Sequence, residues 1–121
     1  MMAAAVMIVA SAGCKSKSPN EPSGPSTAST VITITSAGAS PRAVEIALGD
    51  RVLFQNNDTQ PHSMTSDPHP EHTDCPPINQ VGFLSAGQKR ETGNFVVQRV
   101  CGFHDHDNPD VQSLHGTITI R

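Results

Sequence analysis

The sequence lacks tryptophan and tyrosine, and it carries little charge. Phenylalanine is its only aromatic residue, at 3% of 121 residues, and charged residues make up 16%. A sheet that stacks nucleic-acid bases on aromatic side chains is therefore not expected. Eight basic residues against eleven acidic ones give a formal charge of −3, so the chain has no excess of positive charge to bind phosphates. Both shortages argue against a nucleic-acid partner.

Proline, glycine and histidine are the residue types that stand out. Ten prolines and nine glycines indicate many turns and few long helices. Six histidines and three cysteines in so short a chain suggest a metal site. The sequence has no nucleophile elbow, no phosphate-binding loop and no paired-carboxylate pattern, so we do not expect an enzyme.

The first thirty residues resemble an export and anchoring segment. Residues 1–13 are apolar, too short to span a bilayer, and end in small residues, which predicts a signal peptide. The tetrapeptide at residues 11–14 resembles the bacterial lipobox, so we expect lipid on Cys14; an ordinary cleaved signal is the alternative. Residues 14–30 are rich in Ser, Pro and Thr and predict a flexible tether. The expected location is the periplasm or outer cell surface, with the lipid as the only membrane contact.

Short runs of alternating or β-branched residues follow from residue 31 to residue 121. They predict strands at 31–35, 42–48, 51–55, 81–84, 88–95, 96–101 and 116–120, with irregular loops at 59–79 and 102–115. Short strands separated by Gly and Pro predict an all-β sandwich in one domain. Its expected core is Ile32, Ile34, Val44, Ile46, Leu48, Val52, Phe54, Leu84, Phe95, Ile118 and Ile120. We expect a monomer.

A cysteine and two histidines form the sharpest metal-binding pattern. Cys101 and His104 lie three residues apart in what we expect to be one loop, and His62 lies far upstream at the end of a strand. One Cys and two His are the ligands of a trigonal blue-copper site. The predicted metal centre is therefore one copper ion held by His62, Cys101 and His104.

Three segments resemble the cupredoxins, the plastocyanin-like copper proteins. Residues 41–62 are similar to the family's Pro, alternating strand, Gly-Asp turn and Pro-His; residues 84–87 are similar to its Leu-x-x-Gly turn. Cys101-x-x-His104 followed by residues 116–120 is similar to its ligand loop and last strand. The resemblance implies a Greek-key β-sandwich, one copper near one end, and one-electron transfer to a redox partner protein that the sequence does not identify.

The ligand loop departs from the family pattern at one position. Leu114 stands where the family places its axial Met, and leucine cannot bind copper. His115 or Met64 could supply the fourth ligand instead. Three further histidines form a second group of candidates: His106, His69 and His72.

A disulfide is the main alternative to the thiolate ligand. Without Cys14, the only cysteines are Cys75 and Cys101, and two cysteines in an oxidising compartment pair by default. Such a bridge would add about 3 kcal/mol of stability in the chain-entropy model and would remove the thiolate. The alternative function is then a periplasmic copper-handling module that uses its histidine-rich loops.

Overall fold

A computed structural model describes residues 28–121 of the chain. The predicted signal peptide, Cys14 and nearly all of the predicted tether lie outside the described residues. Within the part that is described, no helix is long and apolar enough to cross a membrane.

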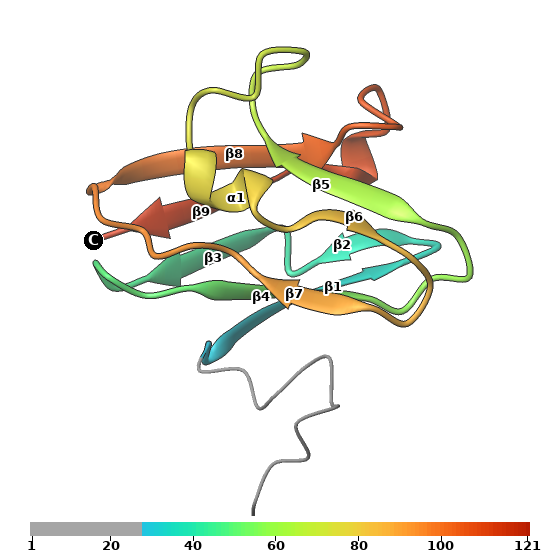
Figure 1. Ribbon diagram of the computed structural model, residues 1–121, viewed down its shortest axis with the longest axis horizontal. Coiled ribbons are helices and arrows are strands. Elements are labelled where there is room, and N and C mark those ends of the chain that lie inside the picture. The colour runs from blue at the N-terminus through green and yellow to red at the C-terminus, as the bar shows by residue number, and fades with distance from the viewer. Residues whose placement is uncertain (1–27) are drawn as a thin grey trace, which may run out of the picture.

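In the described residues, nine strands form two sheets that pack face to face (Figure 1). In spatial order, the first sheet contains β2 (Gly38–Ser40), β1 (Thr30–Thr35), β4 (Val52–Asn56) and β7 (Lys89–Glu91). The second contains β3 (Ala43–Ile46), β9 (Gly116–Ile120), β8 (Arg99–Asp105), β5 (His62–Ser66) and β6 (Gly82–Leu84). The predicted all-β sandwich is confirmed.

Two parallel pairings place the most regular runs of the sequence side by side. β1 pairs with β4 so that Ile32 lies opposite Phe54, and β3 pairs with β9 so that Val44 lies opposite Ile118. The other pairings are antiparallel. Because side chains alternate between the two faces of a strand, the alternating runs direct one apolar face of each sheet inward.

The two predicted loops are shorter than expected. β5 begins directly after Pro61, within the predicted loop 59–79, because the other prolines of this segment lie beyond residue 67 and leave 62–66 free to pair. β8 runs on to Asp105, past the predicted strand end at Cys101. The described chain also has one short helix, α1 (Pro76–Asn79), and one 3₁₀ turn, η1 (Gln112–Leu114).

The core is anchored by an aromatic pair that joins the two sheets. Phe54 of β4 and Phe103 of β8 are both fully buried, with ring centroids 5.2 Å apart in an edge-to-face arrangement. Gly116 of β9 leaves room for this pair, since a Cβ atom there would lie 2.3 Å from the Phe103 ring. Most of the predicted core is buried. Leu48, however, is 49% exposed because it lies beyond the end of β3, and Val44 is only partly buried.

We expect Phe54→Ala to lower the free energy of unfolding by about 3–5 kcal/mol, because it removes a buried ring and leaves a cavity between the sheets. Chemical denaturation measures the change. The matched control is Phe83→Ala, since Phe83 is 56% exposed and its loss should cost about 0.5 kcal/mol or less. Equal losses in the two variants would contradict the assigned core.

Candidate metal centre

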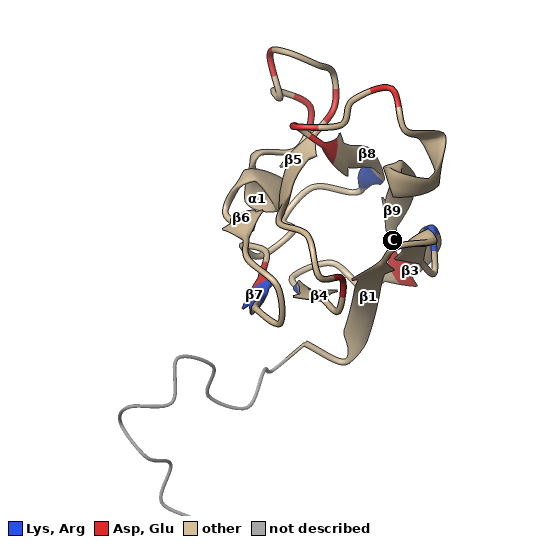
Figure 2. Cartoon of the chain, turned by 90° about the vertical axis from the view of Figure 1, so that its right-hand side faces the viewer, with Lys and Arg blue, Asp and Glu red and all other residues tan. Residues whose placement is uncertain are grey.

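The histidine-bearing segments meet beside the paired strands β5 and β8 of the second sheet. The segment after β5 and the segment after β8 both rise from the same side of the sandwich (Figure 1). Acidic residues lie on both segments, as Figure 2 shows. Pairing of β5 with β8 brings these two chain segments together, with Thr65 opposite His104.

β8 separates the three predicted copper ligands. Its alternation places Cys101, Phe103 and Asp105 on the inner face and Gly102 and His104 on the outer face. His62 lies on the inner face of neighbouring β5, where its ring bonds to Asp105. The structure therefore does not bring His62, Cys101 and His104 together. The predicted grouping assumed that residues 102–104 belong to a loop, whereas they are part of a strand.

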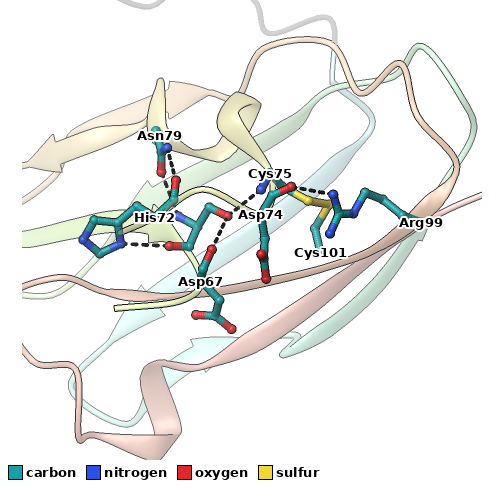
Figure 3. The surroundings of a disulfide bond; sticks show 8 residues. Asp67, His72, Asp74, Cys75, Asn79, Arg99 and Cys101 are labelled. Carbon is teal, nitrogen blue, oxygen red and sulfur yellow. Dashed lines mark hydrogen bonds between the residues drawn. A yellow bond between two sulfur atoms is a disulfide. The ribbon is translucent and has the colours of Figure 1, made fainter. Parts of the chain in front are cut away.

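Cys101 is bonded to Cys75 rather than free. The two residues form a disulfide with Cα atoms 5.9 Å apart, and both are buried (Figure 3). A disulfide sulfur is not a thiolate, so the thiolate-ligand assignment of Cys101 is corrected here. The alternative disulfide pairing of Cys75 and Cys101 is the one that the structure contains.

Both ring nitrogens of His62 are occupied by carboxylates. Nδ1 lies 2.6 Å from Asp105 Oδ2, and Nε2 lies 2.9 Å from Asp58 Oδ2. Burial alone would lower the pKa of His62, but the hydrogen bonds to Asp58 and Asp105 outweigh it and raise the pKa. Burial would likewise raise the pKa of Asp105, yet hydrogen bonds from Asn108 and His62 hold it below its usual value. His62 therefore forms a buried ion pair in the protein interior.

Three other histidines form a cluster that could hold a metal ion. His69, His72 and His104 each offer one ligand atom, and these atoms all lie within 4.8 Å of one another. Their ring centroids are 5.0 to 5.5 Å apart. We call this group the three-histidine site. It joins the outer face of β8 to the loop after β5.

A carboxylate orients the His104 ring. His104 Nδ1 lies 2.5 Å from Asp67 Oδ1, which leaves Nε2 as the nitrogen for a metal. Nε2 lies 3.5 Å from the Thr65 hydroxyl. Burial lowers the pKa of His104 although the hydrogen bond to Asp67 opposes this shift, so the ring favours the neutral form that metals bind. Gly102 makes room for Asp67, because a Cβ atom there would lie 2.1 Å from its carboxylate.

A backbone carbonyl orients the His72 ring. His72 Nδ1 donates to the Ser66 carbonyl oxygen at 2.8 Å, which directs Nε2 away from the backbone. His72 also has a φ of 55°, an uncommon left-handed conformation for a residue other than glycine. Strained residues of this kind cluster at functional sites. Metal-binding histidines typically donate their second ring N–H to a carboxylate or a carbonyl, as His104 and His72 do.

The remaining candidate ligands lie beside the site or away from it. His106 Nδ1 lies 2.9 Å from His72 Nε2, so it borders the site. His115 is stacked on His104, but its Nε2 donates to the Pro109 carbonyl oxygen at 2.6 Å. Met64 is fully buried in the hydrophobic core and faces inward, so it is not placed to bind a metal at the three-histidine site.

We expect the ion pair of His62 to make stability depend on pH. Because its pKa is raised on folding, the stabilisation is complete below the unfolded pKa of about 6.5 and is lost as pH rises through the folded value. His62→Gln should remove this loss. Denaturation curves between pH 5 and 9, with a chelator present, measure the effect.

The matched control for this experiment is His106→Gln, an exposed histidine whose ring is hydrogen-bonded to His72, whereas Asp58 and Asp105 bond to His62. This variant should keep the alkaline loss of stability that the wild type shows. If His62→Gln and the wild type lose stability in parallel as pH rises, the ion-pair assignment is wrong.

Comparison with known proteins identifies the fold. No protein-family model and no curated protein matches the sequence. Among solved structures, the chain is similar to a purple cupredoxin from Nitrosopumilus maritimus (21% identity, covering 76% of this chain and 99% of that one, TM-score 0.59). It is also similar to plastocyanin from Dryopteris crassirhizoma (12% identity, covering 76% of this chain and 100% of that one, TM-score 0.60). A third similar structure is a Met-to-Leu variant of amicyanin (16% identity, covering 76% of this chain and 81% of that one, TM-score 0.60). The chain is therefore cupredoxin-like in fold.

Proposed function

We propose that this protein binds one copper ion at the three-histidine site and works as a copper-handling module rather than as a thiolate-dependent electron carrier. The observation that carries the proposal is the convergence of His69, His72 and His104, with two of the rings held by hydrogen bonds at their second nitrogens. A set of three imidazoles suits copper and zinc. Among divalent first-row metals, copper binds such nitrogen sites most tightly.

Each residue of the site has a definite role in this proposal. His104 is the buried ligand on the sheet, whereas His69 and His72 come from the loop and are exposed or half-buried. Asp67 and the Ser66 carbonyl oxygen position the two hydrogen-bonded rings. Bound copper would supply a Lewis acid, and a redox centre if it cycles between Cu(I) and Cu(II).

An oxidising compartment suits this proposal. Disulfides persist in secreted and periplasmic proteins and are rare in the cytosol, so the Cys75–Cys101 bond supports a place in the cell envelope. An anchor at Cys14 remains a prediction from the sequence alone. Lipid on Cys14 would hold the copper site at a membrane surface.

Electron transfer is the second candidate function. The fold favours it, because two of the similar structures are described as the oxidised form of plastocyanin and the reduced state of an amicyanin variant. In this chain the electron would have to pass through a centre without a thiolate, since Cys101 is bonded to Cys75. A copper complex that cycles reversibly without loss of metal would favour this candidate over copper handling.

We expect titration with Cu(II) to show one tight copper per chain and no intense thiolate-to-copper absorption band, because the ligands are imidazoles. His69→Ala/His72→Ala should abolish tight binding, since it removes two of the three ligands. Binding is measured by competition with a chelator of known affinity, and nitrogen ligation by electron paramagnetic resonance.

His62→Gln is the control for this copper titration, because His62 lies on the inner face of the sheet and is bonded to Asp58 and Asp105. It should bind copper as the wild type does. The opposite pattern, loss of copper in His62→Gln and none in the double variant, would refute the three-histidine site.

We expect Asp67→Asn to weaken copper binding by about 10–100-fold, since the residues that orient metal-bound histidines typically contribute this much. The substitution keeps the size of the side chain over Gly102 but weakens its hold on the Nδ1–H of His104. Asp74→Asn removes the same charge from the same loop and should leave the affinity nearly unchanged. Equal effects would mean that overall charge, and not ring orientation, determines affinity.

A further inference from the structure

The loop that carries His69 and His72 buries almost nothing of its own. Residues 67–74 are all exposed or half-buried, and no apolar side chain of this segment enters the core. Segments with few buried contacts open most readily from a native structure. Something other than hydrophobic packing must therefore hold these two histidines next to His104.

Hydrogen bonds supply part of that hold, as Figure 3 shows. Ser66 Oγ accepts from the Cys75 backbone N–H at 2.7 Å, and the Asp67 carbonyl oxygen accepts from the Asp74 N–H at 3.0 Å. Asn79 Nδ2 donates to the His72 carbonyl oxygen at 2.7 Å, and Arg99 Nη1 donates to that of Asp74 at 2.6 Å. The last two of these bonds are exposed to solvent, where a hydrogen bond contributes little net stability.

The disulfide supplies the covalent part. Cys75 follows His72 by three residues, and Cys101 precedes His104 by three residues in β8. The bond therefore ties the loop that carries two ligands to the strand that carries the third. It is fixed at one end in the rigid sheet and at the other just before α1.

A groove borders this bond. Both cysteines help to line a groove of about 260 Å³ whose other walls include Pro76, Phe95 and Val97. Cys75 and Cys101 are themselves only 2% and 0% exposed. The bond is therefore protected in the closed structure, and a reductant would reach it where the loop opens.

We infer that the Cys75–Cys101 disulfide regulates the three-histidine site: the oxidised protein binds copper tightly, and reduction of the bond frees the loop and weakens binding. This inference rests on the proposed function. The reductant is a dithiol, which gives two electrons and two protons. The sulfur–sulfur bond breaks, Cys75 and Cys101 become thiols, and the dithiol becomes a disulfide. Freed from β8, His69 and His72 no longer stay near His104.

The first test compares copper affinity with and without the disulfide. All proteins carry Cys14→Ser, so that no other thiol is present. Cys75→Ser/Cys101→Ser mimics the reduced protein without adding thiol ligands, and its affinity for Cu(II) should fall by about 5–150-fold, the usual range of coupling between two sites. Circular dichroism verifies that the sandwich is folded. An unchanged affinity in the folded variant would overturn the inference.

A matched control separates loss of the tie from loss of stability. Ile32→Ala removes a fully buried side chain from β1 in the other sheet and should cost about 2–5 kcal/mol, comparable with the loss of a disulfide. Its disulfide stays intact, so its copper affinity should equal that of the wild type. An equal fall in both variants would show that general destabilisation, and not the disulfide, lowers the affinity.

The second test needs no cysteine variant and therefore holds even if that variant fails to fold. A metal bound by His69, His72 and His104 would hold the loop against β8, so the buried disulfide would open to a reductant less often. Zn(II), which takes imidazole ligands and has no redox chemistry, serves as the probe. Saturating Zn(II) should slow the reduction of the disulfide by a phosphine, measured by alkylation of new thiols. Identical rates with and without bound Zn(II) would overturn the inference.

The two tests distinguish failure of the inference from failure of the proposed function. A wild-type protein that binds neither Cu(II) nor Zn(II) would refute the three-histidine site itself, and with it the inference. A wild-type protein that binds copper tightly, with the same affinity in the folded double-serine variant, would leave the proposed function standing and refute only the regulation.

Discussion

The bond between Cys75 and Cys101 is the constraint on which the chemistry of this molecule depends. It takes both cysteine sulfur atoms of the folded domain out of the set of metal ligands, because a disulfide is not a thiolate. It also ties the loop after β5 to β8 and, together with hydrogen bonds, holds the two loop histidines of the three-histidine site near His104. One bond thus removes the thiolate as a ligand and helps to hold together the imidazoles of the proposed metal site.

The second sheet divides the histidines into two environments with different consequences. On its inner face, His62 is paired with Asp105, a fully buried carboxylate that also accepts hydrogen bonds from Asn108 and from backbone N–H groups. A buried charge whose hydrogen bonds are all made within the protein belongs to the folded structure and is not available to a ligand. On the outer face, Asp67 holds only one nitrogen of His104 and leaves the other for a ligand. Pairing with aspartate therefore leaves His62 no ring nitrogen for a metal, whereas it leaves one on His104.

Much of the fold could be predicted from the sequence, but the grouping of the histidines could not. Alternating residues in β1, β3 and β9 carry the periodicity of a half-buried sheet. Residues 102–105 carry no such signal, since a glycine and two polar residues flank Phe103, so the end of β8 was expected to be a loop. That prediction placed Cys101 and His104 together in one loop. The strand instead directs their side chains to opposite faces of the sheet. Asp67 lies between a serine and a proline, and nothing in the sequence around it indicates that it orients His104.

The unequal anchoring of its ligands determines what the three-histidine site can do well. Fast electron transfer needs ligands that hold one geometry in both oxidation states, which requires side chains locked by packing. His104 meets this condition, since it is buried in a strand, but His69 is exposed and its loop adds nothing to the core. Loss of two loop ligands would leave copper with a single nitrogen, too few to retain it. Under the proposed function, one fixed and two detachable ligands would suit the uptake and release of a metal better than electron transfer.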